Sequence, residues 1–210
     1  MALRAVIFDF GMVLTGAPDA KAHAELVRIT GLDAEHFETF YWADRHAYDE
    51  GKLTGIGFWR KLVRDAGLNL PDSAIEELNL WDARMWTTVD PAMLAWHEKL
   101  KRAGVLTAIL SNMGDSVLEN IEREFGWLSS FDALVWSYQL GMAKPDPAIY
   151  EHALKQLEAA PGETLFIDDK PVNVEAARAL GMQALVYTTM TALRYDLLDR
   201  GFSPGLPLPE

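Results

Sequence analysis

Short apolar runs alternate with segments of helical periodicity along most of this chain, and the apolar runs end at or beside Asp, Ser or Gly. Alternation of this kind is typical of a parallel sheet whose strands are connected by helices. The pattern predicts five strands, at Ala2–Asp9, Val105–Ser111, Ala133–Trp136, Thr164–Asp168 and Ala184–Tyr187. The predicted fold class is therefore α/β, with a Rossmann-like parallel sheet as its core.

Helix signals occupy the intervals between the later strands. Apolar side chains recur at helical spacing over Met93–Ala103, and the following Gly104 suits the left-handed cap of a helix. Asp146 and Pro147 are the residue types favoured at the N-cap and at the first position of a helix. We therefore expect helices directly before the second strand and directly before the fourth.

Residues 16–89 carry almost no strand signal and separate the first strand from the second. They contain three apolar stripes at helical spacing, which are Ala22, Leu26 and Ile29, then Phe58, Leu62 and Ala66, then Ile75, Leu78, Trp81 and Met85. A crossover between parallel strands needs only about a dozen residues. The sequence therefore predicts an α/β core of residues 1–15 and 90–210 and an inserted helical domain of residues 16–89. Because the insertion follows a strand end, we expect it to be a lid over a site there.

Composition narrows the range of partners. The 210 residues carry a formal net charge of -12, which disfavours a nucleic acid or an anionic membrane as a partner. There is no cysteine, so disulfides, thiolate nucleophiles and Cys-ligated metals are excluded. No apolar run has membrane-spanning length, and we expect a cytoplasmic protein. The proline-rich tail, residues 203–210, is expected to form an extended surface strap or a frayed end.

Carboxylates stand at the ends of two predicted strands. Asp9 follows Val6–Phe8, and Asp168 and Asp169 follow Leu165–Ile167. Each is compatible with an ordinary turn. Two adjacent carboxylates at an apolar strand end raise each other's pKa unless a cation compensates, and Mg²⁺ prefers ligation by oxygen alone. The carboxylate of Asp9 also has the chemistry to attack phosphorus and form an aspartyl-phosphate.

A hydroxyl and a cation accompany these carboxylates. Ser111 and Asn112 follow an apolar run, where a hydroxyl and exposed backbone N–H groups would form a phosphate cradle. The alternative is a helix N-cap, although Asp115 or Ser116 already supplies one. Lys144 precedes a proline, which favours extended backbone, and its ammonium is either solvated or neutralises charge at the site. Since open α/β sheets bind ligands at the carboxyl ends of their strands, we expect one phosphate-handling site.

Together these clusters resemble the haloacid dehalogenase-like (HAD) hydrolase superfamily. The motifs that carry the resemblance are Phe8-Asp-Phe-Gly-Met-Val-Leu14, Leu110-Ser-Asn112, Gly141-Met-Ala-Lys-Pro-Asp-Pro147, Phe166-Ile-Asp-Asp-Lys-Pro-Val-Asn173 and Glu175-Ala-Ala-Arg-Ala-Leu-Gly-Met182. The resemblance covers the whole predicted core and implies the HAD fold. It also implies that the helical insertion is a C1-type cap, which selects the substrate and excludes water.

The resemblance assigns a role to each cluster. The implied catalytic residues are Asp9 as nucleophile, Ser111 and Lys144. The implied phosphate-binding residues are Ser111, Asn112 and Lys144. The implied Mg²⁺ ligands are Asp9, Gly11 through its carbonyl, Asp168 and Asp169. The implied cofactor is Mg²⁺, and the implied partner is a small phosphorylated molecule.

Gly11 departs from the pattern. Most phosphatases of the superfamily have a second Asp at this position, whose carboxylate transfers protons, and glycine keeps only the backbone carbonyl. General acid–base assistance typically contributes about 10²–10⁴-fold to a rate, so the loss is chemically significant. Some groups of the superfamily also have glycine here, and we place the chain in this Asp-x-Gly branch.

The insertion offers its own candidates, Arg45 and His46. They are predicted on one helix together with Tyr41, Trp42 and Asp49, where they would either face solvent or meet an anionic part of the substrate. His46 is also a candidate for supplying the proton that residue 11 does not.

The leading hypothesis is a Mg²⁺-dependent phosphatase that hydrolyses a small phosphorylated metabolite through an aspartyl-phosphate at Asp9. The first alternative is a 2-haloacid dehalogenase, whose relatives lack the second Asp but need no metal and usually replace the Asp168-Asp169 pair. The second is a catalytically weakened HAD-fold binding or regulatory protein. The sequence is also compatible with a homodimer.

Overall fold

A parallel five-stranded sheet forms the centre of the computed structural model, which describes residues 3–202 and 205–210. Its strands are β1 (Ala5–Phe8), β2 (Leu106–Ser111), β3 (Ala133–Trp136), β4 (Thr164–Asp168) and β5 (Gln183–Val186), in the order β3-β2-β1-β4-β5. All five predicted strands are present, and three of them are shifted by one to three residues at one or both ends. Ala2, the predicted start of the first strand, lies outside the described residues.

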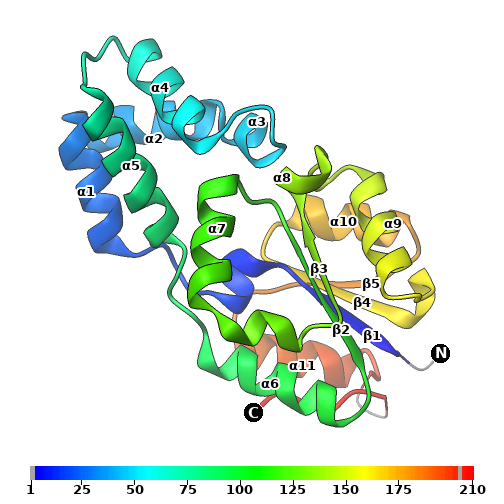
Figure 1. Cartoon of the computed structure of the whole chain (residues 1–210). Helices are drawn as coiled ribbons and strands as arrows, with labels where there is room; N and C mark the ends of the chain where they lie inside the picture. The colour runs from blue at the N-terminus through cyan, green and yellow to red at the C-terminus, as the bar shows by residue number, and fades with distance from the viewer. Residues whose placement is uncertain (1–2, 203–204) are drawn as a thin grey trace.

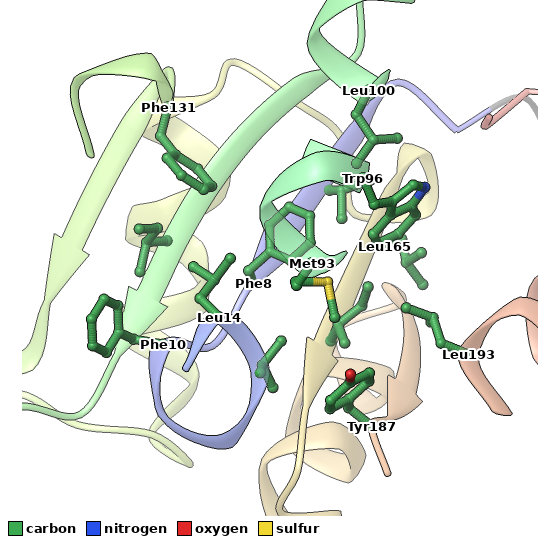
Figure 2. Packing of buried hydrophobic residues seen from close by; sticks show 14 of the residues in the cluster. Phe8, Phe10, Leu14, Met93, Trp96, Leu100, Phe131, Leu165, Tyr187 and Leu193 are labelled. Atoms are coloured by element: carbon green, nitrogen blue, oxygen red, sulfur yellow. The ribbon is translucent and has the colours of Figure 1, made fainter. Parts of the chain in front are cut away.

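Helices cover both faces of the sheet. Val6 and Phe8 of β1 pack on one face with α6 (Pro91–Arg102), α7 (Asp115–Glu124) and α11 (Met190–Asp199). Figure 2 shows Phe8 together with Met93 and Trp96 of α6. Ala5 and Ile7 point the other way, toward α9 (Pro147–Gln156) and α10 (Pro171–Ala179). Because strand side chains alternate between faces, a strand buried on both sides is apolar throughout. The Rossmann-like α/β core is therefore confirmed.

The residues between β1 and α6 are helical. They form α1 (Ala20–Thr30), α2 (Ala34–Ala43), α3 (Arg45–Asp49), α4 (Gly55–Asp65) and α5 (Asp72–Met85), and they have a hydrophobic cluster of their own. Figure 1 shows these helices beyond the end of the sheet toward which β1 runs. We call them the cap. The exact division of the chain into two domains stays a prediction.

The two connections between core and cap run side by side. The N–H of Gly16 donates to the carbonyl of Thr88 at 2.7 Å, and the N–H of Asp90 donates to the carbonyl of Leu14 at 2.9 Å. An isolated antiparallel bridge joins residues 15 and 89 between these two bonds. The cap is thus joined to the core through two short chain connections that pair with each other.

Short elements complete the connections: a kinked turn at Phe10–Leu14, 3₁₀ turns at Gly126–Ser130 and Pro161–Glu163, and α8 (Ser137–Leu140). Two local predictions were wrong. The helix predicted through Tyr41 and Asp49 is interrupted at Asp44, whose φ of -116° and ψ of 8° end α2 and begin α3. The N-cap of α7 is Gly114 rather than Asp115 or Ser116, because the helix already includes both of these residues.

The end of the tail is a strap. Leu206 is buried, and the carbonyl of Pro207 accepts from Nε1 of Trp96 at 2.7 Å, which joins the tail to α6. The carbonyl of Pro209 accepts from Arg194 of α11 at 2.5 Å. Residues 203–204 of the predicted strap lie outside the described residues. Among the helices that the structure describes, none is both long and apolar enough to cross a membrane.

Candidate active site

Three neighbouring strands deliver polar side chains to one edge of the sheet. Asp9 follows β1, Ser111 ends β2 and Asp168 ends β4. Since β2 and β4 flank β1 in parallel, their carboxyl ends meet at this edge. The sequence therefore predicted the location of the candidate site from strand ends alone.

Lys144 joins the two strand-end carboxylates. Its side chain is buried, and its Nζ lies 2.8 Å from Oδ1 of Asp9 and 2.6 Å from Oδ2 of Asp168. Asn112 holds the backbone of Lys144 in place: its Oδ1 accepts from the Lys144 N–H at 2.8 Å, and its Nδ2 donates to the Lys144 carbonyl at 2.8 Å. In this structure the Asn112 side chain therefore positions the lysine loop.

Asp168 is oriented by three further contacts. Its Oδ1 accepts from the backbone N–H of Lys170 at 2.8 Å, and both of its oxygens lie 3.0 Å from Nδ2 of Asn173. The sequence reasoning did not recognise Asn173 as part of the site. The available signal was its position in the first turn of the helix that follows the Asp pair, where a side chain can reach back to a preceding carboxylate.

Burial and the neighbouring charges shift the pKa values of Asp9 and Lys144 in opposite directions. Burial raises the pKa of Asp9 to about 7, although the Lys144 ammonium opposes the shift. Burial disfavours the ammonium of Lys144, but its attraction to Asp9 and Asp168 is stronger and raises the pKa of the lysine. Lys144 is therefore charged at neutral pH, while Asp9 takes up or releases a proton in that range.

The carboxylates form a cluster suited to a hard cation. One oxygen from each of Asp9, Asp168 and Asp169 lies within 4.8 Å of the other two. Burial and the neighbouring Asp168 raise the pKa of Asp169, which is the electrostatic cost that a bound cation removes. A donor set made only of oxygens fits Mg²⁺. The participation of the Gly11 carbonyl stays a prediction.

A cavity of about 260 Å³ lies above this edge. Most of the predicted site residues line it, namely Asp9, Gly11, Arg45, Ser111, Asn112, Lys144 and Asp169. Asp168 is fully buried and is not part of the lining. Other lining residues, which were not among the predicted site residues, include Met12, Pro18, Trp42, Asp49, Trp86 and Lys170.

Residues 3–181 match the haloacid dehalogenase-like hydrolase family. The chain belongs to this family. The assignment agrees with the sheet order, with the strand-end carboxylates and with the resemblance seen in the motifs. This HAD-like hydrolase is therefore an enzyme of the hydrolase class.

Curated relatives include phosphatases. The chain is 32% identical to the sesquiterpene phosphatase astK of Aspergillus oryzae over 197 residues, which cover 92% of this chain and 94% of that protein. It is 35% identical to the mouse bifunctional epoxide hydrolase 2 over 158 residues, which cover 72% of this chain. The matched segment spans only 28% of the length of the mouse protein.

A solved structure has the same fold. The HAD family enzyme bt-2542 of Bacteroides thetaiotaomicron, crystallised with magnesium and inorganic phosphate, superimposes with a TM-score of 0.73 at 21% sequence identity. The superposition covers 89% of this chain and 95% of that one. At this identity the likeness establishes the fold of the HAD-like hydrolase.

The two predicted cap residues differ in position. Arg45 of the HAD-like hydrolase is buried and lines the cavity, with Nη1 3.0 Å from Asp82 and Nε 3.1 Å from Asp49. His46 does not line the cavity: its side chain is 64% exposed and lies 3.4 Å from Glu50. The prediction that His46 contacts substrate is therefore not supported by its position in this structure.

The cap of this HAD-like hydrolase is in direct contact with the core. Ser137 donates to the carbonyl of Asp49 at 2.5 Å, and the N–H of Gly55 donates to Asp115 at 2.8 Å. At Gly114 an added Cβ would lie 2.1 Å from the ring of Tyr48. A side chain at position 114 would therefore prevent this approach of cap to core.

Proposed function

We propose that this HAD-like hydrolase is a Mg²⁺-dependent phosphatase that forms an aspartyl-phosphate at Asp9. The observation that carries the proposal is the grouping of Asp9, Asp168 and Asp169 at one sheet edge, with the Lys144 ammonium bonded to two of them. The names of the phosphatase relatives support the same reaction class.

Each residue has a task in the first half-reaction. An oxygen of Asp9 attacks the phosphorus, and the bond from phosphorus to the alcohol oxygen breaks. Ser111 would hold a phosphate oxygen, and Lys144 would neutralise the charge shared by carboxylate and phosphate. Mg²⁺, held by Asp9, Asp168 and Asp169, would supply further neutralisation of the phosphoryl oxygens. Water then attacks the phosphorus and restores Asp9.

The departing alcohol needs a proton, and Gly11 has no carboxylate to supply one. His46 lies outside the cavity, whereas Asp49 lines it. Burial raises the pKa of Asp49 against the opposing charge of Arg45. A proton delivered from the cap would therefore come from Asp49 rather than from His46.

The two alternative functions are less well supported. A 2-haloacid dehalogenase has no use for the Asp168-Asp169 pair as metal ligands, and the pair is retained here within a compact carboxylate cluster. A weakened binding protein would not need Lys144 to remain bonded to the nucleophile. A small phosphorylated molecule remains the proposed partner. A homodimer and a cytoplasmic location stay predictions.

The test is hydrolysis of p-nitrophenyl phosphate by the native chain, with Mg²⁺ and after treatment with EDTA. We expect turnover with Mg²⁺ and loss to the background rate with EDTA and in Asp9→Asn. The exposed Asp199 provides the matched control, since Asp199→Asn should keep the native rate. Equal turnover without metal would refute the proposal. Metal-independent halide release from a 2-haloacid would instead establish the dehalogenase.

A further inference from the structure

The cavity is lined by two kinds of residue. Asp9, Lys144 and Asp169 supply the charged part that would receive phosphate. The apolar lining residues are Phe10, Met12, Pro18, Trp42, Trp86 and Val117. They come from the turn after β1, from the cap and its connections, and from α7, so the fold gathers apolar side chains from separate elements around one charged patch.

Two of these side chains leave apolar surface open to solvent. Met12 is 40% exposed and Trp42 is 50% exposed, and both border the cavity. Apolar surface in water is unfavourable, and a ligand that covers it gains the corresponding free energy. Met12 also has a φ of 61°, which is uncommon for a residue with a side chain. Its flexible thioether can adapt to differently shaped apolar groups.

Arg45, the cap cation that lines the cavity, is already compensated. Arg45 bonds to Asp82 and to Asp49, so two carboxyl groups share one guanidinium. Lys170 of the core also lines the cavity and follows Asp169 directly in the chain. The Arg45 guanidinium is therefore not left unbalanced for a second phosphate or a carboxylate on the substrate.

The amide side chains at the cavity are also occupied. Both polar atoms of Asn112 bond to the backbone of Lys144, and Nδ2 of Asn173 bonds to Asp168. A sugar or polyol presents several hydroxyl groups, each of which loses free energy when it is buried without a partner. Because these two amides already form bonds within the core, they have fewer donors and acceptors left for such hydroxyl groups.

We propose that the substrate is the phosphate monoester of a neutral, apolar alcohol, whose hydrocarbon part is held by Met12, Trp42 and Trp86. The inference rests on the phosphatase function proposed above and specifies its substrate class. With a volume of about 260 Å³, the cavity is close to the lower limit of roughly 300–1,000 Å³ that is usual for small-molecule sites. The phosphate and the first carbons would lie inside, and the remaining chain would cover the exposed Met12 and Trp42.

The first experiment compares a series of n-alkyl phosphates, from ethyl to hexyl, with ribose 5-phosphate and glucose 6-phosphate in the presence of Mg²⁺. We expect kcat/KM to rise by about threefold to fourfold for each methylene group, the factor expected for burial of a CH₂. Both sugar phosphates should be at least about tenfold poorer than hexyl phosphate. A flat alkyl series, or a sugar phosphate that exceeds hexyl phosphate, would overturn the substrate class while leaving the phosphatase proposal intact.

Variants of Met12 and Trp42 test whether these two side chains cause the gain in kcat/KM per methylene group. Trp42→Ala and Met12→Asn should each reduce the gain per methylene, and asparagine suits the backbone conformation of position 12 because it tolerates a positive φ. Tyr195→Ala removes an aromatic side chain that is even more exposed, at 67%, but lies on α11, and it should keep the native series. If Trp42→Ala and Met12→Asn both kept the native gain per methylene, these side chains would not hold the hydrocarbon part.

A binding measurement tests the apolar substrate class independently of the phosphatase proposal. Hexyl phosphate and ribose 5-phosphate are titrated calorimetrically into Asp9→Asn with Mg²⁺, where no turnover is needed. At least about tenfold tighter binding of hexyl phosphate supports the apolar substrate class even if no phosphate ester is hydrolysed by the native chain. Equal or tighter binding of the sugar phosphate refutes it, whatever the result of the activity assay.

Discussion

Replacement of Lys144 by methionine tests whether Lys144 is the buried counter-ion of Asp9 and Asp168. Methionine keeps most of the length of the lysine side chain and removes its ammonium, so Asp9 and Asp168 lose the cation at 2.8 and 2.6 Å. Removal of one partner from a buried ion pair typically costs about 3–5 kcal/mol, because a charge remains buried without compensation. Here Asp9 can take up a proton, since its pKa is already about 7, and we therefore expect the lower figure.

The free-energy loss converts into a measurable change in Tm. With an unfolding entropy of about 2.1 cal/mol/K per residue, the 210 residues give about 0.44 kcal/mol/K near 60 °C. A loss of about 3 kcal/mol then lowers Tm by about 7 °C. Without the ammonium, which opposes the effect of burial, the folded-state pKa of Asp9 lies further above its unfolded value. The folded state therefore loses stability as pH rises, and the Tm difference should be larger near pH 8 than near pH 5.5.

The assay is thermal unfolding of native and Lys144→Met protein at both pH values, with and without Mg²⁺. The matched control is Lys52→Met, whose ammonium is paired with Glu50 on the surface and is 67% exposed; its Tm should stay within about 1 °C of native. Mg²⁺ should narrow the gap between native and Lys144→Met, because the cation neutralises the same carboxylates. A Tm equal to native at both pH values would refute the description of Lys144 as the buried counter-ion.

Two further predictions concern proton transfer and metal binding. In Gly11→Asp the new Cβ would lie 3.9 Å from the ring of Trp86, which is an ordinary contact. We expect this variant to hydrolyse alkyl phosphates about 10²-fold faster than the native chain. The rate for p-nitrophenyl phosphate should change little, because its leaving group needs no proton. Equal acceleration of both would contradict a role in leaving-group protonation. Because Asp9 has a pKa of about 7 and must be ionised to bind a cation, Mg²⁺ affinity measured by calorimetry should weaken about tenfold per pH unit below 7 and level off above it. An affinity independent of pH between about 5.5 and 7 would contradict this pKa.

The parts of the fold that the sequence predicted are those determined by local periodicity. The strand Thr164–Asp168 was predicted with its observed bounds because an apolar run buried on both faces ends abruptly at a carboxylate. Parallel pairing then places Asp168 beside the end of β1 without any further information. A site built from strand ends can be located in this way, since the sheet converts positions in the sequence into neighbours in space.

The cap side of the site could not be predicted in the same way. Arg45 and His46 are adjacent in the sequence, but successive residues of a helix point about 100° apart, so one of them lines the cavity and the other faces solvent. Which of them does so depends on the rotation of α3, and that rotation follows from packing of Tyr48 against the core at Gly114. The break at Asp44 adds a further change of direction that helical periodicity does not signal.

The glycine at position 11 and the indole of Trp86 are best understood together. The direction that a side chain would take from residue 11 leads toward the Trp86 ring, which lines the same cavity. A carboxylate in that direction would lie against an apolar surface, where desolvation raises its pKa and disfavours its charged form. Glycine avoids that cost and leaves the Trp86 ring open to the cavity. The missing carboxylate is therefore consistent with an active site arranged to contact an apolar alcohol.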